Sequence, residues 1–172
     1  MSQSTDLLSN LELFRQSLCR LVADLMLKKQ LCLAAAESCT GGLIAAACTD
    51  LAGSSQWFDR GFVTYSNAAK TDMLGVDAAL IMQFGAVSEP VAAAMAQGAV
   101  KYSTAKVSVS VTGVAGPTGG SAEKPVGTVW IGWCVDGQTT TELCHFDGDR
   151  ATIRSLTVQR ALQGLIERLQ SA

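Results

Sequence analysis

The spacing of apolar residues predicts that the chain opens with an amphipathic helix over residues 7–26. The apolar positions recur every three or four residues, which places them on one helical face: Leu7, Leu11, Phe14, Leu18, Leu21 and Leu25. The same spacing fits a coiled-coil seam, but about three heptads without a continuation favour packing on the domain's own sheet or on a partner subunit. Residues 1–6, which precede the pattern, are expected to form a loose tail.

Two strand-then-helix units follow. The apolar run at 31–36 leads into the turn ESCTGG at 37–42, and helical spacing resumes over residues 43–51. A second strand is predicted at 61–65. Ser66 or Asn67 can then cap a short helix that carries Lys70 and ends at Gly75.

An alanine-rich helix and a valine-rich strand come next. Ser88 and Pro90 mark the helix start, and its small side chains allow it to lie close to a sheet. From residue 107 to 112 valines alternate with Ser108, Ser110 and Thr112, so one face of the strand is apolar and the other carries small hydroxyls.

The last third of the sequence predicts a hairpin and a closing helix. Strands near 126–135 and 139–146 are joined by Asp136-Gly137, a preferred type I′ pair, and should be antiparallel. Asp149 can cap the final helix. Its inward residues are expected to be Ile153, Val158, Leu162, Leu165 and Leu169, with Arg154, Glu167 and Arg168 in solvent.

This order of elements predicts an α/β protein, specifically a three-layer α/β/α sandwich with a mixed sheet. The chain shows no internal repeat, low-complexity tract or linker, and 172 residues suit one domain. We therefore expect residues 1–172 to form a single domain.

Composition narrows the range of partners. The 13 basic and 15 acidic residues nearly cancel and form no long run, which favours a small-molecule partner over a nucleic acid or a membrane. No segment reaches the roughly 18 apolar residues of a membrane span, and the start of the chain lacks a signal-peptide pattern, so a cytoplasmic location is expected.

The cysteines and the single histidine argue against a metal site. The six cysteines form no Cys-x-x-Cys pair and are expected to be free thiols. His145, the only histidine, is expected to be structural, and no zinc ligand set is visible. A magnesium site leaves weaker traces in sequence and is not excluded. We expect no metal and no cofactor.

The turn that begins at Ser38 is the first candidate for chemistry. A hydroxyl at a strand end, ahead of a helix, lies near backbone N–H groups that can hold an oxyanion, here those of Thr40, Gly41 and Gly42. The glycines also permit close approach of a ligand. The simpler interpretation is that Ser38 or Thr40 only caps the helix.

A catalytic serine needs a base, and Lys70 is the best candidate. With one histidine in the chain, a Ser-His-Asp arrangement is a poor fit. A lysine serves when burial lowers its pKa toward about 7–8, and Lys70 lies among alanines just after a strand end. Tyr65 can orient or relay the proton. Otherwise Lys70 is a solvated helix lysine and Tyr65 packs in the strand.

The glycine-rich loop at 113–120 and Arg150 are candidates for binding an anion. The loop fits neither standard phosphate fingerprint, yet its backbone N–H groups, with the hydroxyls of Thr112 and Thr118, can form an anion nest that includes Gly113 and Gly116. Arg150 can bind a phosphate in a bidentate way. A plain surface loop and a surface salt bridge are the alternatives.

Taken together, five blocks in the same order resemble the CinA C-terminal domain family, over about residues 7–169. The blocks are AESCTGG at 36–42, TYSNAAK at 64–70, GAVSE at 85–89, TGVAGPTGG at 112–120 and PVGTV at 125–129. The resemblance implies an α/β/α fold, a homodimer or higher homo-oligomer, and the form of the domain that stands without the larger N-terminal domain of full-length CinA proteins.

The resemblance also implies an activity. The family includes amidohydrolases that convert nicotinamide mononucleotide and water to nicotinate mononucleotide and ammonia in pyridine-nucleotide recycling, without a cofactor. Its catalytic serine, tyrosine and lysine correspond here to Ser38, Tyr65 and Lys70. One departure is Ala68, where the family commonly has an acidic residue. Helix positions two apart do not face each other, so a minor effect on Lys70 is expected.

Three other functions remain open from the sequence. The domain can be a nucleotide-binding regulatory module that has the pocket without the chemistry. It can be a partner-binding protein related to competence or DNA repair, although its near-neutral charge argues against direct nucleic-acid contact. It can also be an amidase for another small carboxamide, which would share the mechanism and differ in the pocket.

Overall fold

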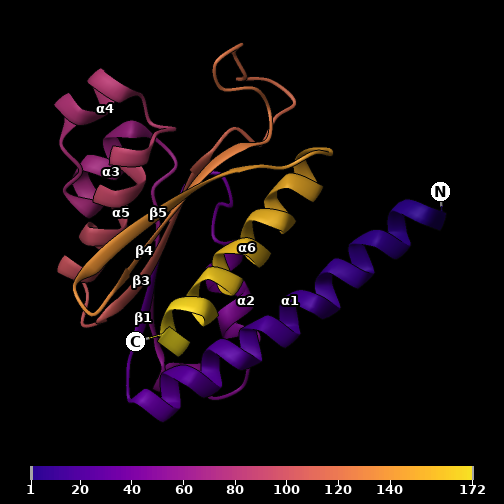
Figure 1. Ribbon diagram of the computed structural model, residues 1–172, viewed down its shortest axis with the longest axis vertical. Coiled ribbons are helices and arrows are strands. Elements are labelled where there is room, and N and C mark those ends of the chain that lie inside the picture. Colours follow the sequence, from indigo (N-terminus) through magenta and orange to yellow (C-terminus); the bar gives the residue numbers. More distant parts are fainter. Residues whose placement is uncertain (1, 172) are drawn as a thin grey trace.

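A computed structural model of the protein describes residues 2–171, with side chains from residue 10 onward (Figure 1). The helices are α1 (Ser2–Lys29), α2 (Leu43–Thr49), α3 (Asn67–Leu74), α4 (Ala78–Phe84), α5 (Glu89–Lys101) and α6 (Arg150–Ser171), with a short 3-10 turn, η1 (Ser54–Gln56). The strands are β1 (Leu33–Glu37), β2 (Phe58–Val63), β3 (Val107–Gly113), β4 (Thr128–Val135) and β5 (Gln138–His145).

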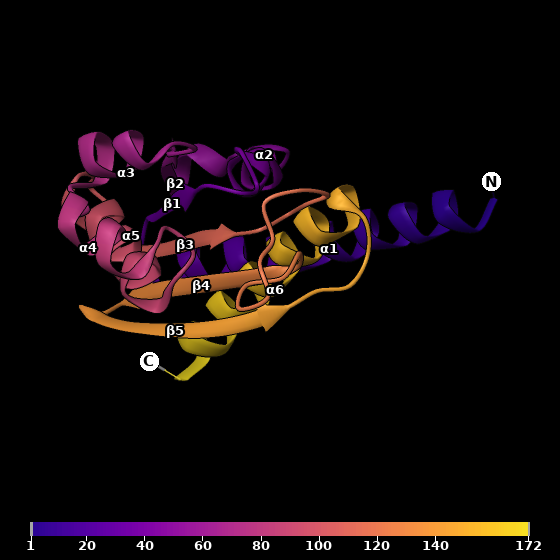
Figure 2. The same cartoon turned by 90° about the horizontal axis from the view of Figure 1, so that it is seen from above.

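The five strands form one mixed sheet in the order β2-β1-β3-β4-β5. β1 pairs in parallel with β2 and β3, while β4 is antiparallel to both β3 and β5. Helices α3, α4 and α5 cover one face, and α2 and α6 cover the other with α1 outside them (Figures 1 and 2). The predicted α/β sandwich with a mixed sheet is therefore confirmed.

Small hydroxyls on β3 let α5 lie directly on the sheet. Ser108 donates a hydrogen bond to the carbonyl of Ala96 at 2.6 Å, and Ser110 donates to that of Ala92 at 2.6 Å. A side chain at Gly132 on β4 would lie 2.7 Å from the Ala92 carbonyl oxygen, so the helix leaves no room there. The alternation of valine and hydroxyl predicted for this strand is confirmed, and it explains the close packing of the alanine-rich helix.

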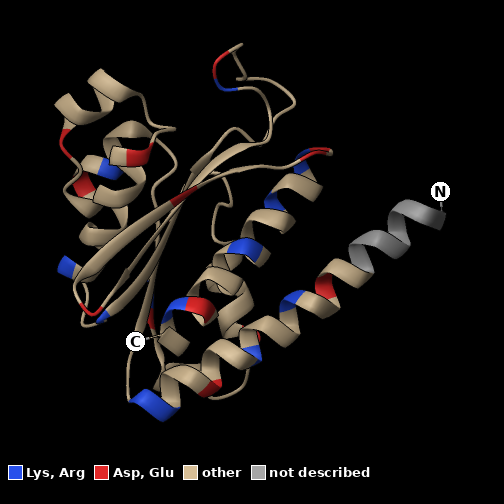
Figure 3. Ribbon diagram, in the orientation of Figure 1, with Lys and Arg blue, Asp and Glu red and all other residues tan. Residues whose placement is uncertain are grey.

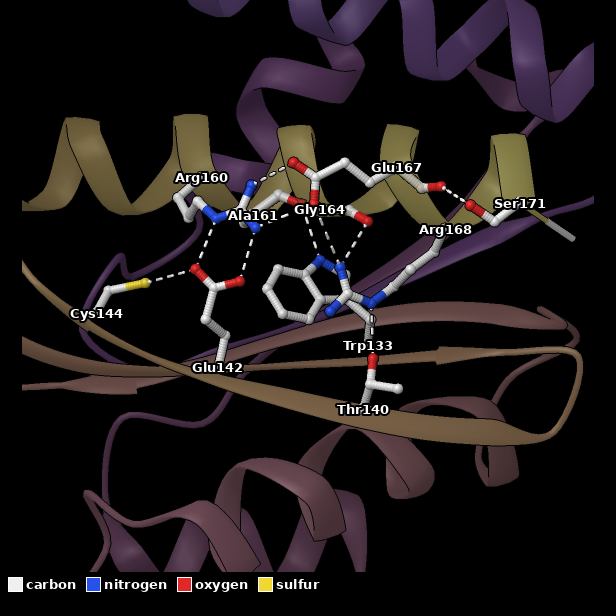
Figure 4. Close-up of polar contacts among 10 residues, drawn as sticks. All are labelled: Trp133, Thr140, Glu142, Cys144, Arg160, Ala161, Gly164, Glu167, Arg168 and Ser171. Atoms are coloured by element: carbon white, nitrogen blue, oxygen red, sulfur yellow. Dashed lines mark hydrogen bonds and ion pairs between the residues drawn. The ribbon is translucent and has the colours of Figure 1, made fainter.

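The opposite face of the sheet holds the larger apolar core. Its valines pack against α6, whose buried residues include the five predicted inward positions, Ile153, Val158, Leu162, Leu165 and Leu169. Trp133 of β4 is fully buried and donates its indole N–H to the carbonyl of Ala161 at 2.9 Å (Figure 4). The guanidinium of Arg168 lies 3.7 Å from the centre of its ring. Arg168 is thus half-buried on Trp133, not in solvent as predicted.

Helix α1 differs from its prediction in length and in the face it buries. It begins at Ser2, so it covers residues 2–6 of the segment expected to be a tail, while Met1 lies outside the described residues. Leu18 is buried as predicted, but Phe14 and Leu21 are 46% and 51% exposed. The buried positions beside it are instead Cys19, Val22, Ala23 and Met26, so the buried face lies about one residue away from the predicted one. That the chain forms one domain stays a prediction.

The predicted caps of α3 and α6 agree with the structure, and one helix was missed. Ser66 accepts the Ala69 N–H at 3.0 Å to cap α3, Gly75 ends that helix in the left-handed region, and Asp149 accepts the Thr152 N–H at 2.9 Å ahead of α6. Asp136 and Gly137 both have positive φ between β4 and β5, as a type I′ turn requires. Helix α4 was not predicted, because its sequence AALIMQF is almost entirely apolar and shows no alternation of apolar and polar faces.

Charge is spread over the molecule, with acidic and basic residues interspersed on both helical layers (Figure 3). All six cysteines are free thiols, as predicted. Among the described residues, no helix combines the length and the apolar character needed to cross a membrane.

Candidate active site

Ser38 and Lys70 meet at the carboxyl edge of the parallel strands. Ser38 directly follows β1 and is held by its backbone N–H, which donates to the Val111 carbonyl of β3 at 3.1 Å. The first turns of α3 bring Lys70 to the same place, so that its Nζ lies 3.0 Å from Ser38 Oγ and 2.9 Å from the carbonyl oxygen of Thr64. Such crevices at strand carboxyl ends are the usual ligand sites of open α/β sheets.

Burial sets the electrostatics of Lys70. Its side chain is 1% exposed, and this burial lowers the pKa of the amine below its usual value. A neutral amine has two protons and one lone pair, so it can donate to the Thr64 carbonyl and accept the Ser38 hydroxyl proton at once. The sequence-based choice of a buried lysine beside Ser38 agrees with this geometry, and the solvated alternative is wrong.

The neighbouring thiol does not compete as a nucleophile. Burial raises the pKa of Cys39 to about 12, so the group stays protonated near neutral pH. Ser38, not Cys39, is the side chain whose hydroxyl lies 3.0 Å from the lysine amine.

Glu37 fixes the start of α2 behind Ser38, a role that the sequence analysis missed. Its fully buried carboxylate accepts the Thr40 hydroxyl at 2.6 Å and the N–H groups of Gly42, Ile44 and Ala45 at 2.9–3.0 Å. A carboxylate is favoured at a helix N-terminus, where unpaired N–H groups and the helix dipole meet. An acidic residue just before the glycine turn was the available signal.

These contacts bear on the prediction that backbone N–H groups of the turn hold an oxyanion. The N–H of Gly42 binds Glu37, and the N–H of Gly41 donates to the Ser38 carbonyl at 3.1 Å. Gly41 and Gly42 have φ of +60° and +103°, a conformation that glycine adopts without strain. The glycines thus shape the turn, and their N–H groups are already engaged instead of turned toward a ligand.

Arg154 reaches this turn from the far end of the chain. Its Nε donates to the Cys39 carbonyl at 3.1 Å and its Nη2 to the Thr40 carbonyl at 2.8 Å. The side chain is half-buried, so the prediction that it lies in solvent is wrong. The helical period of α6 alone does not reveal a contact with a residue more than one hundred positions away.

A pocket of about 210 Å³ opens beside the Ser38–Lys70 pair. Of the predicted site residues, Ser38, Tyr65, Lys70, Thr112, Gly113 and Arg150 line it. Cys39, Asn67, Ala86, Val87 and Ala115 also line it and were not predicted. The pocket thus collects residues from the ends of all three parallel strands and from the start of α6.

Arg150 and Tyr65 meet at the mouth of the pocket. Arg150 donates to the Tyr65 hydroxyl at 3.1 Å and to the carbonyl of Gly116 at 2.8 Å. Tyr65 is 62% exposed, so it does not pack in the strand. Gly116 thus contacts Arg150 and does not line the pocket. Thr118 also lies outside the pocket lining and is exposed further along the loop. Thr112 lines the pocket while its hydroxyl donates to the Ala86 carbonyl at 2.8 Å.

These features define a class: an α/β/α protein with a serine and a buried lysine in contact at the carboxyl edge of a mixed sheet. Comparison with known proteins is more specific. A family model of the CinA C-terminal domain matches residues 15–169, nearly the whole chain. The chain belongs to the CinA C-terminal domain family.

Relatives in this family carry two kinds of name. The nicotinamide-nucleotide amidohydrolase PncC of Enterobacter agglomerans is 57% identical over 138 residues, 80% of each chain. PncC of Escherichia coli K12 is 54% identical over 76% of this chain and 79% of its own. A CinA-like protein of Akkermansia muciniphila is 53% identical, but the matched region is only 33% of its length.

Solved structures agree with the fold. The competence/damage inducible protein CihA from Agrobacterium tumefaciens superposes with a TM-score of 0.85 at 48% identity, covering 90% of this chain and 94% of that one. A CinA superfamily protein from Klebsiella pneumoniae 700603 gives a TM-score of 0.89 at 35% identity, covering 92% and 99%.

Proposed function

We propose that the protein hydrolyses the carboxamide of nicotinamide mononucleotide to nicotinate mononucleotide and ammonia, a step of pyridine-nucleotide recycling. The observation that carries the proposal is the buried Lys70 amine 3.0 Å from the Ser38 hydroxyl. The relatives named nicotinamide-nucleotide amidohydrolase support the substrate. The six free cysteines fit a cytoplasmic protein.

Ser38 acts as the nucleophile and Lys70 as the base in this proposal. Neutral Lys70 takes the Ser38 proton as Oγ attacks the carboxamide carbon. The resulting ammonium of Lys70 passes this proton to the amide nitrogen. The C–N bond then breaks, ammonia leaves, and the acyl group remains bound to Ser38 as an ester. A water molecule then gives a proton to Lys70 and attacks the ester carbon. The bond between Ser38 Oγ and the ester carbon breaks, Oγ takes the proton from Lys70, and the acid is released.

Arg150 and Tyr65 are assigned to the substrate. Arg150 has a planar cationic group at the pocket and suits the phosphate of the nucleotide. Binding that remote group would position the amide for attack. Tyr65 lines the same pocket and accepts a hydrogen bond from Arg150, and it is assigned to orienting the substrate or the transferred proton.

Ammonia release by the purified protein with nicotinamide mononucleotide tests the proposal. We expect turnover that survives a chelator, because serine and lysine supply both the nucleophile and the base. Ser38→Ala should lose it, whereas Ser55→Ala, a control at an exposed serine of η1, should retain it. Nucleotide binding without turnover in the unmodified protein would instead support the non-catalytic binding module.

A further inference from the structure

The turn that carries Ser38 is restrained from two sides by opposite charges. Glu37 binds donors, namely the Thr40 hydroxyl and the N–H groups at the start of α2. Arg154 binds acceptors, the consecutive carbonyls of Cys39 and Thr40. Glu37 is local, whereas Arg154 comes from α6 and restrains the turn carbonyls from a distant part of the chain.

The turn needs an external restraint because it ends in two glycines. Gly41 and Gly42 have no side chains to limit their dihedral angles, and both adopt left-handed values. The guanidinium packs against this backbone, since a Cβ added to Gly41 would lie 3.5 Å from Arg154 Nη2. Two hydrogen bonds from one planar group fix two successive peptide units, which a single point contact would not do.

The charge of Arg154 is directed at the turn. Arg160, six residues further along α6, forms ion pairs with Glu142 and Glu167. By contrast, no carboxylate among residues 10–171 forms an ion pair with Arg154. Its contacts are the neutral carbonyls of Cys39 and Thr40, so no paired carboxylate draws the guanidinium away from the turn.

We propose that Arg154 is a positioning residue for Ser38: by binding the Cys39 and Thr40 carbonyls it holds the Ser38 hydroxyl against Lys70. The inference rests on the proposed role of Ser38 as nucleophile. It does not require nicotinamide mononucleotide to be the substrate, because the contacts are made within the protein. A displacement of about 1 Å at a reacting group costs roughly 100-fold in rate, so the effect should be large.

The test compares three Arg154 variants with a matched arginine on the same helix. The rate at which a fluorophosphonate probe labels Ser38 reports the reactivity of the serine without any substrate. For Arg154→Met we expect labelling and kcat to fall about 10- to 100-fold with little change in KM, because the variant moves the nucleophile and not the pocket. Arg154→Lys keeps the charge but not the planar fork, and should fall between Arg154→Met and the unmodified protein. Arg160→Met should be labelled by the probe, and should turn over substrate, at the same rates as the unmodified protein.

Rescue separates positioning from a general loss of structure. Methylguanidinium added to Arg154→Ala should restore labelling, and should have no effect on Arg160→Ala. Labelling of Arg154→Met at the full rate, or a loss in Arg154→Ala that methylguanidinium does not reverse, would overturn the inference. Labelling of the unmodified protein without ammonia release would contradict the proposed substrate and leave the Arg154 comparison intact. Failure to label the unmodified protein at Ser38 would overturn both.

Discussion

At the scale of single residues, the buried Lys70 should link activity to the pH dependence of stability. Its lowered pKa means that the folded protein binds this proton less tightly than the unfolded chain does. Between that lowered pKa and the ordinary lysine value of 10.5, the unfolded state holds more protons, so the free energy of unfolding rises with pH. The slope is at most about 1.4 kcal/mol per pH unit.

Lys70→Met should remove this slope together with the activity. We expect turnover to fall at least about 100-fold through loss of the base, and kcat/KM of the unmodified protein to rise with pH through the lowered pKa of Lys70. Urea unfolding at several pH values measures the slope for both proteins. Lys106→Met, at an exposed lysine, is the control and should keep both the slope and the activity. An equal slope in Lys70→Met would mean that another group titrates.

The residues of the site differ in how far the sequence alone predicted them. Ser38 and Lys70 were found because each needs a chemical partner and the histidine count left few choices. Arg154 was missed because its partners are backbone carbonyls, which no side-chain motif displays, and the position of Glu37 before the glycine turn was a signal left unused. Arg150 was found as a candidate, but its contact with Tyr65 depends on the fold, since 85 positions separate the two residues.

At the scale of elements, sequence predicted best where a local signal fixes the backbone. Asp136-Gly137 specified the hairpin, and Ser66, Gly75 and Asp149 marked helix ends, because each acts within a few residues. The buried face of α1 was predicted poorly, because Leu21 and Val22 are both apolar and only the shape of the neighbouring helices decides between them. Period alone does not measure that fit.

The contact between α6 and β4 gives a prediction at this scale. Gly164 lies on the Trp133 ring, and a Cβ added there would be 2.2 Å from Cζ2 and 2.4 Å from Cε2 (Figure 4). Gly164→Ala should therefore destabilise the protein by about 1–3 kcal/mol through overpacking, although alanine is the better helix former. Urea denaturation measures the change.

A second substitution identifies the cause of that loss. Trp133→Phe removes the part of the ring that the new methyl group would meet, so Gly164→Ala should cost less in that background than in the unmodified protein. Equal costs in the two backgrounds would show that the ring is not what excludes the methyl group. Arg168 also packs on the Trp133 ring, and Trp133→Phe changes that contact in both arms of the comparison.

At the scale of the whole molecule, helix α1 leaves an apolar surface uncovered. Its first half extends beyond the body of the protein in both views (Figures 1 and 2). On α1 as a whole, Leu13, Phe14 and Leu21 are 65%, 46% and 51% exposed. Phe14 and Leu21 are seven positions apart and share a face of the helix, which is the spacing of a helix–helix contact. Exposed apolar patches of this kind commonly mark interfaces.

We propose that a second copy of the chain covers this surface, as the family resemblance implies for a homodimer. Two-fold pairing would place the same stripe of each copy against the other. Phe14→Glu combined with Leu21→Glu should convert the dimer to a monomer in light scattering after size-exclusion chromatography, because it buries charge in an apolar contact. Met82→Glu, at an 83% exposed position on α4, should leave the dimer unchanged. A dimer that survives the α1 substitutions would place the interface elsewhere, and a monomeric unmodified protein would contradict the homodimer itself.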